Sequence, residues 1–258
     1  TGNITIDVAD TKTLTYTGTA ISLGANTLTL TGGGSLVSGG LTLNDPSSKL
    51  LLNSITVDNV STTSDSLGLD VDADSTVTSL SVANITPVSI ASGKILSGAI
   101  TVTAGSIKLA ETGKLASTIS MSGGVLDADN SLTVSGALSH TDDITIDVAD
   151  TKTLTYTGTA ISLGANTLTL TGGGSLVSGG LTLNDPSSML LLNSITVDSV
   201  STSADSSSGG LDVDDNSTVS SLSVAHITPV SIASGKTLSG AITVTAGSIK
   251  LDDTGTLA

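Results

Sequence analysis

Apolar and polar residues alternate along almost the whole chain, in short pieces separated by Gly, Asn or Asp. Typical pieces are TLTLTG at residues 27–32, LTLND at 41–45 and AITVTAG at 99–105. Strict alternation over four to six residues is typical of a half-buried β-strand, and no window has the spacing of an amphipathic helix. The pattern therefore predicts an all-β protein with no significant helix.

The spacing of these pieces favours a parallel β-helix (β-solenoid). They recur about every seven residues, which is too close for the strands and turns of a β-sandwich. Three short strands joined by tight Gly or Asn bends make one coil, so we expect about 20 residues per coil. Leu28 and Leu30 should then point inward, as should Leu14 and Tyr16. The alternative is a run of small β-sandwich domains of about 140 residues each.

A long internal repeat lies above this short period. Residues 4–66 recur as 144–206 at an offset of 140, and residues 69–116 recur as 211–258 at an offset of 142. Two residues are inserted in the second copy around Ser207–Gly210. We therefore interpret residues 1–258 as one continuous β-solenoid with a complete unit at 4–143 and a truncated second copy at 144–258. About 13 coils at about 4.8 Å each would form a rod about 60 Å long.

The first matching segment differs from its copy at four positions, and the segment that follows the first copy has no counterpart. The four changes are Lys49/Met189, Asn59/Ser199, Thr63/Ser203 and Ser64/Ala204, and the segment without a counterpart is Ser117 to Asp143. No capping segment is visible at either end. We therefore expect that the native chain continues or that subunits stack end to end, because exposed coil edges are normally covered.

Composition narrows the possible partners and locations. The 258 residues include no Cys, Trp, Phe, Arg or Gln, and the net charge is −15. An acidic surface without Arg repels phosphate, so neither nucleic acid nor an anionic membrane is an expected partner. The apolar runs are too short to span a bilayer, and the start TGNITID has no signal-peptide pattern. Low charge density with abundant Thr, Ser and Gly favours an extracellular location on a bacterial surface.

The sequence texture resembles that of a known class of surface proteins. The pieces L-T-x-T-G, G-G-x-L-x-x-G-G and I-T-V, strung along an acidic chain without Cys, resemble repeat arrays of bacterial β-solenoid adhesins. These are adhesins of the filamentous-haemagglutinin and autotransporter-passenger type. The resemblance covers the whole chain and implies a secreted, cell-surface or filament-forming role. It transfers no site residue, because no diagnostic motif is matched.

Candidate catalytic groups are few. His140 and His226 are not at equivalent positions of the two copies, and the counterpart of His226 is Asn84, so we predict solvated or corner histidines. No G-x-S-x-G elbow occurs. SGKT at 234–237 lacks the first Gly of a phosphate-binding loop, because Val230 stands there, and is interpreted as a coil corner with an exposed Lys. We predict no catalytic residue, no cofactor-binding residue and no enzyme activity. A polysaccharide-active enzyme is the remote alternative.

Alternating aspartates form the most distinctive polar groups. A strand would place them about 7 Å apart on one outward face, where a hard cation such as Ca²⁺ would relieve their repulsion. The EF-hand form fails, because Ser75 and Ser81 stand where Gly and Glu are required. We therefore predict a solvated acidic face and no metal or cofactor, with a weak Ca²⁺ site as the alternative. The residues are Asp70, Asp72 and Asp74, then Asp212 and Asp214, and finally Asp127 and Asp129.

The leading functional hypothesis is a structural one. We expect a non-catalytic segment of a long secreted bacterial surface protein, forming an adhesin stalk or extracellular filament by coil stacking. Its partners would be copies of itself end to end or further repeats of the same chain, with cell-surface or matrix polymers as further candidates. Outward Thr in TLTYTGT (13–19) and TLTLT (27–31) raises ice binding as a second hypothesis, although SLVSGG and KLLLNS interrupt the Thr pieces.

Overall fold

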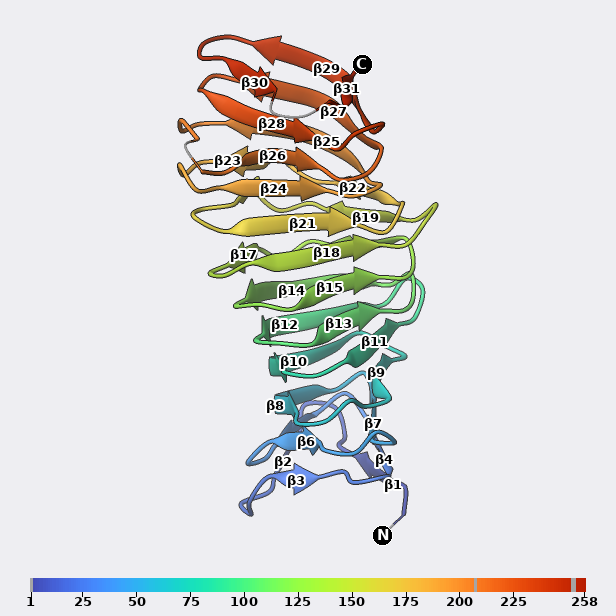
Figure 1. Ribbon diagram of the computed structural model, residues 1–258. Helices are drawn as coiled ribbons and strands as arrows, with labels where there is room; N and C mark the ends of the chain where they lie inside the picture. The colour runs from blue at the N-terminus through green and yellow to red at the C-terminus, as the bar shows by residue number, and fades with distance from the viewer. Residues whose placement is uncertain (1, 207, 252–253) are drawn as a thin grey trace. The chain divides into compact units, whose positions relative to one another are not determined.

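The described residues form a parallel β-solenoid of about 12 turns with about 20 residues per turn (Figure 1). The computed structural model describes residues 2–206, 208–251 and 254–258. These residues contain no helix, so none is long and apolar enough to cross a membrane. The predicted fold class is confirmed, with slightly fewer coils than the 13 expected. The chain divides into two compact units, Thr1–Ala137 and Leu138–Ala258, called unit 1 and unit 2 below.

Sheet A of unit 1 takes one strand from each coil. Each strand pairs in parallel with the equivalent strand of the next coil, as Leu28 does with Leu50 and Leu50 with Leu69. The steps of 22 and 19 residues are the lengths of two successive coils. In pairing order the strands are β1 (Ile4–Asp7), β4 (Thr27–Thr31), β7 (Lys49–Asn53), β9 (Gly68–Val71), β11 (Thr86–Ile90), β13 (Ser106–Leu109) and β15 (Val125–Ala128).

Sheet B of unit 1 has two rows, so each coil has three faces. Row B1 runs from β5 to β8 through Val57, and row B2 runs from β6 to β8 through Val60. Early coils use two short strands for the rows, whereas later coils use one long strand that bends. The strands are β2 (Thr13–Thr15), β3 (Ile21–Ser22), β5 (Ser35–Val37), β6 (Leu41–Leu43), β8 (Thr56–Thr62), β10 (Ser75–Val82), β12 (Ile95–Val102), β14 (Lys114–Met121) and β16 (Leu132–Val134).

Unit 2 repeats this plan with the same register. Leu168 pairs with Leu190 as Leu28 pairs with Leu50. Its sheet A holds β18 (Ile144–Val148), β21 (Thr167–Thr171), β24 (Met189–Leu192), β26 (Gly210–Val213), β28 (Thr228–Ile232) and β30 (Ile249–Leu251). Its sheet B holds β17 (Leu138–His140), β19 (Thr153–Tyr156), β20 (Ile161–Ser162), β22 (Ser175–Val177), β23 (Leu181–Leu183), β25 (Thr196–Thr202), β27 (Ser217–Val224), β29 (Thr237–Val244) and β31 (Thr256–Leu257).

The core consists of aliphatic ladders that run from coil to coil. Leu28 and Leu30 are buried between less buried threonines, as their alternation predicted. Because each inward residue stacks on its counterpart one coil away, branched aliphatic side chains fill the narrow interior without aromatic rings. One ladder of unit 1 contains Leu28, Leu50, Leu69, Val88, Leu109 and Ala128.

The long strands bend where the register shifts. Between β10 and β12 the pairing changes from Val77 with Gly98 to Ser79 with Ala99, so Thr78 is an extra residue, as in a β-bulge. Gly98 has φ +128°, and a Cβ there would lie 1.7 Å from the carbonyl oxygen of Val77. Only Gly fits this close backbone approach. The bend turns row B1 into row B2.

Corner chemistry also follows the sequence. The Asn-Asp-Pro segment at 44–46 lies in the turn after β6, as predicted. Ser48, which is buried, donates its hydroxyl to the carbonyl oxygen of Gly24 in the preceding coil at 2.7 Å. The same hydroxyl accepts the backbone N–H of Asp45 at 2.9 Å. The corner is therefore tied both to itself and to its neighbouring coil.

The predicted burial of Leu14 and Tyr16 is wrong, although their copies in unit 2 are buried. Leu14 is 43% exposed and Tyr16 45%, whereas Leu154 is 1% and Tyr156 4% exposed. The local sequences are identical, so the strand pattern alone does not decide burial. Tyr156 lies under the segment Leu138–His140, which precedes the second copy. No residues stand at the corresponding positions ahead of Tyr16.

The ladder predicts a sharp difference between neighbouring leucines. Leu50→Ala removes a fully buried side chain and should lower the free energy of unfolding by about 2–5 kcal/mol, because a cavity remains in the core. Leu51→Ala is the matched control. Leu51 stands on the outward face of the same strand, so its loss should cost less than about 0.5 kcal/mol. Denaturant unfolding measures both, and equal effects would contradict the ladder.

Candidate functional site

Side-chain oxygens at the corners accept backbone N–H groups of a neighbouring coil. In unit 1, Asp65 Oδ1 accepts the N–H of Ile85 at 2.9 Å, and Asp74 Oδ1 accepts that of Ile95 at 2.9 Å. A corner interrupts the strand ladder, and a backbone N–H left there without an acceptor would be costly. Much of the acidic character of the chain therefore serves the backbone. In unit 2 the equivalent acceptors are Asp205 for Ile227 and Asn216 for Thr237.

The predicted single face of Asp70, Asp72 and Asp74 is wrong. Strand β9 ends at Val71, so Asp70 projects from the strand while Asp72 and Asp74 lie in the following corner. In unit 2, β26 likewise ends at Val213, with Asp212 on the strand and Asp214 beyond it. The alternating pattern extends past the strand, and the bend redirects the later carboxylates.

Lysines neutralise some of these aspartates. Asp70 forms an ion pair with Lys49 of the preceding coil. Lys108 Nζ lies 2.9 Å from Asp129 Oδ2 and 3.4 Å from Asp127 Oδ2. The hydrogen bond with Asp129 is the main reason why the pKa of Lys108 is raised above its ordinary value, and both carboxylates add to it. Exposed pairs of this kind contribute little to stability, so they balance charge between coils.

The SGKT segment lies at a corner, as predicted. Lys236 donates to Asp215 Oδ1 at 2.8 Å, and this bond is the largest cause of a lowered pKa at Asp215. The backbone N–H of Lys236 bonds to the carbonyl oxygen of Ala233, which closes the turn. The lysine is therefore held at the corner by a neighbouring coil. The structure gives it no phosphate-loop geometry.

The two histidines lie in different surroundings. His226 is at a corner, as predicted, and its Nδ1 is 3.4 Å from Asp205 Oδ1. His140 ends β17, where Nδ1 lies 3.1 Å from the carbonyl oxygen of Asp142. His140 Nε2 is buried without a hydrogen-bond partner. Neither histidine contacts a hydroxyl in the manner of a catalytic pair in the described hydrogen bonds.

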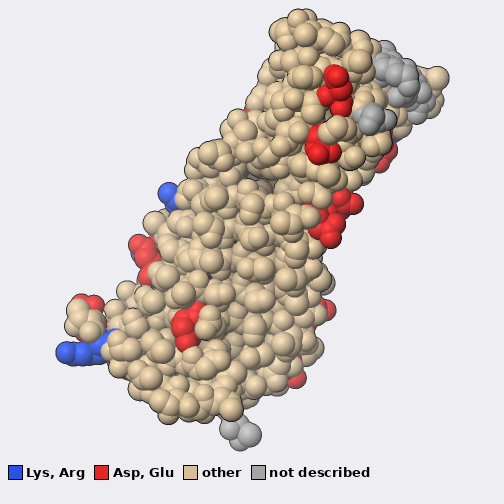
Figure 2. Space-filling view, turned by 90° about the vertical axis from the view of Figure 1, so that its left-hand side faces the viewer, with Lys and Arg blue, Asp and Glu red and all other residues tan. Residues whose placement is uncertain are grey.

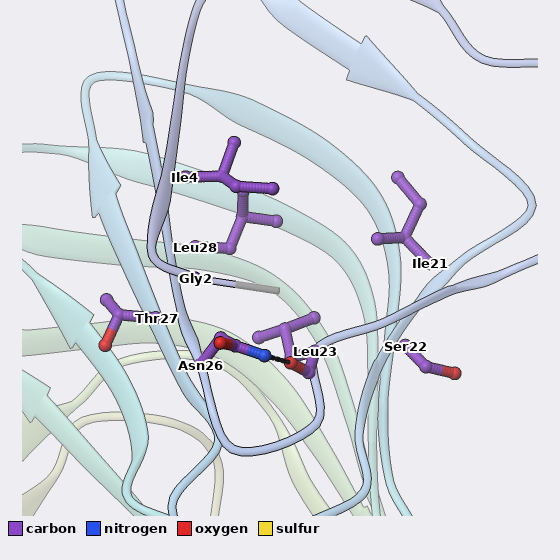
Figure 3. Close-up of a pocket in the computed structure, with 8 residues that line it drawn as sticks. All are labelled: Gly2, Ile4, Ile21, Ser22, Leu23, Asn26, Thr27 and Leu28. Carbon is purple, nitrogen blue, oxygen red and sulfur yellow. Dashed lines mark hydrogen bonds between the residues drawn. The ribbon is translucent and has the colours of Figure 1, made fainter.

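Two small hollows in unit 1 have different linings. The apolar one is about 140 Å³ and lies at the first coil, where Ile4, Ile21, Leu23 and Leu28 line it (Figure 3). A polar hollow of about 140 Å³ lies at the corner between β7 and β8, lined in part by Ser54 and Asp74. Both are too small for a typical organic ligand, whose sites measure about 300–1,000 Å³.

An outward row of hydroxyl residues was missed at the sequence level. Along row B2 of unit 1, six coils place Ser or Thr in register, with steps of 19 or 20 residues. The Ser61 hydroxyl donates to Thr42 Oγ1 at 3.4 Å. Counting Ser and Thr at the coil length, rather than within one strand, would have found it. The residues are Ser22, Thr42, Ser61, Ser81, Thr101 and Ser120; in unit 2 they are Ser162, Thr182, Ser201, Ser223 and Thr243.

This hydroxyl row lies beside another file of small uncharged residues. In unit 1 that file contains Asn59, Ser79, Ala99 and Thr118. Sheet A differs, because its outward file runs Thr5, Thr29, Leu51, Asp70 and Ser89. Charged side chains form small separate groups with broad uncharged surface between them (Figure 2).

Within the described ranges, no group of three or more His, Cys, Asp or Glu side chains is arranged to hold a metal ion. Comparison with known proteins gives no further guide to a site. Neither a protein-family model, nor a curated protein, nor a solved structure matches the chain. The fold therefore defines a repeat-type β-solenoid, and its function must be argued from the molecule itself.

The corner bonds lead to a test of what the acidic residues do. Asp65→Ala removes the acceptor of the Ile85 N–H and should lower the free energy of unfolding by about 1–2 kcal/mol. Asp65→Asn keeps an acceptor oxygen, so most of that stability should remain. Asp72→Ala removes an exposed carboxylate from a nearby corner and should change stability by less than about 0.5 kcal/mol. If Asp65→Ala matched Asp72→Ala, charge rather than hydrogen bonding would explain the acidic corners.

Proposed function

We propose that this chain is a structural, non-catalytic segment of a secreted bacterial surface protein. It would act as an adhesin stalk or extracellular filament that grows in length by stacking coils. The observation that carries the proposal is the repetition of register. Leu28 pairs with Leu50 in unit 1, and their copies Leu168 and Leu190 pair in the same way in unit 2. A sequence copy thus becomes a structural copy, which is the property that a length-determining scaffold requires.

The distribution of polar residues also supports a scaffold role. Corner aspartates such as Asp65 accept backbone N–H groups, and exposed pairs such as Lys49 with Asp70 join neighbouring coils. These side chains are accounted for by contacts that every added coil can repeat. The expected partners are further repeats of the same chain or copies of it, and cell-surface or matrix polymers are candidate targets.

A chain with a third copy tests the scaffold proposal. We would insert a second copy of residues 4–143 before Ile144, which adds about seven coils. The particle should lengthen by about 34 Å with an unchanged cross-section, since coils stack at about 4.8 Å. Small-angle scattering and electron microscopy measure this. An insertion of equal length made of Gly and Ser is the control and should give no fixed increment. A separate globular density for the added copy would contradict the proposal.

Ice binding is a second candidate function, favoured by one observation. The hydroxyl row on row B2 is periodic from coil to coil and has a file of small uncharged neighbours. A two-dimensional array of hydroxyl groups is suited to order water on its surface. The Thr pieces first considered for this role do not form such an array, because Leu51 and Asp70 follow Thr29 in their file.

Thermal hysteresis distinguishes ice binding from a purely structural role. If the hydroxyl row binds ice, the double variant Thr101→Lys and Thr243→Lys should lose the effect, because a long charged side chain prevents close approach in both units. The matched control is Ser89→Lys on sheet A, which should keep the effect. An unmodified chain without hysteresis or ice shaping at high concentration would remove this candidate.

A further inference from the structure

The first coil presents an apolar surface whose exact sequence copy is buried elsewhere in the protein. Ile4 is 57% exposed, and Leu14 and Tyr16 are exposed as well, whereas Ile144, Leu154 and Tyr156 are all buried. The apolar hollow shown in Figure 3 lies at this coil, lined by Ile4, Ile21, Leu23 and Leu28 among others. Exposed apolar side chains that interrupt a continuous ladder indicate a surface made for contact.

Unit 2 identifies what covers the copied tyrosine. The backbone N–H of Leu138 donates to the Tyr156 hydroxyl oxygen at 3.0 Å. A few residues later, Asp143 Oδ1 accepts the N–H of Thr167. In unit 1 the same acceptor role toward Thr27 belongs to Asn3 Oδ1, at 2.9 Å. The final contact of the preceding segment is thus already present in unit 1, while the contact with Tyr16 is not.

Tyr16 already has the local conformation of its buried copy. A Cβ on Gly18 would lie 2.3 Å from the Tyr16 ring carbon Cζ, and a Cβ on Gly158 would lie 2.3 Å from Cζ of Tyr156. Each ring therefore folds over the glycine two residues ahead, whether it is covered or not. A side chain that keeps its bound conformation while exposed has less conformational entropy to lose on contact.

We propose that the first coil of unit 1 is a recognition surface for a segment with the sequence of residues 117–143. The proposal rests on the proposed stacking function and names the partner of this coil. The segment has the length of a coil, ends in the residues Leu138 to Asp143, and stands directly before the second copy. Residues 237–258 would be out of phase, because they correspond to residues 95–116, which this same segment follows in the sequence.

The two tyrosines provide a direct test, because the chain has no Trp to mask their emission. In a Tyr156→Phe background, Tyr16 is the reporter, and residues 117–143 are placed ahead of Ile4 in place of residues 1–3. Acrylamide quenching should fall from the level of a ring that is 45% exposed to that of Tyr156, which is 4% exposed. The Tyr16→Phe chain supplies the buried reference.

Two matched extensions control for nonspecific cover. In the first, Leu138→Pro within the added segment removes the N–H that donates to the tyrosine oxygen, so protection of Tyr16 should be partly lost. In the second, residues 237–258 replace the segment and should leave Tyr16 accessible. Circular dichroism verifies that each chain keeps its β-structure.

The proposal is overturned if Tyr16 stays accessible beneath residues 117–143 in a folded chain, or if residues 237–258 protect it equally. These outcomes are separate from the test of the scaffold. A third copy that lengthens the particle while Tyr16 stays accessible would contradict this inference alone. A protected Tyr16 in a chain that does not lengthen would contradict the scaffold proposal alone.

Discussion

Parallel pairing of each strand with its counterpart one coil away is the constraint on which the rest of the structure depends. It places Leu28 on Leu50 and Leu50 on Leu69, so side chains of similar shape stack within one narrow interior. Each coil can then be stable only against its neighbours, as in other repeat proteins. The absence of Phe and Trp follows naturally, because a thin core of repeated layers has no room for rings of different sizes.

The corners are where this constraint is hardest to satisfy, and they account for much of the polar sequence. A bend breaks the ladder and leaves backbone N–H groups without strand partners. Asp65, Asp74 and Asn216 fill this role with side-chain oxygens. The exchange of Asp74 for Asn216 between the copies keeps the acceptor and removes the charge. This indicates that the oxygen, more than the charge, is what the corner requires.

The outward faces are less constrained, and there the three faces of the coil diverge. Sheet A carries Lys49, Asp70 and Lys108, whereas row B2 carries files of small uncharged residues. Since outward side chains do not enter the core, they are free to serve contacts beyond the chain. The proposed stalk role uses the ends of the solenoid, while the ice-binding candidate uses one of its sides. The two therefore place different demands on the same coils.

The sequence alone determined the fold class, the coil length and the inward face of most strands. Alternation with period two identifies strands, and the copy at offset 140 identifies a repeat, because both signals are local. Corner positions such as 44–46 and 234–237 were also predictable, since Pro and Gly restrict the backbone there.

Only the tertiary structure decided what depends on the neighbouring coil. Alternation placed Asp70, Asp72 and Asp74 on one face, but the strand ends at Val71 and the chain bends. The hydroxyl row was hidden because its members lie about 20 residues apart in sequence. Tyr16 and Tyr156 have identical local sequences, yet one is exposed and the other is buried. The physical reason is that a strand pattern specifies which way a side chain points, whereas burial requires another coil to cover it.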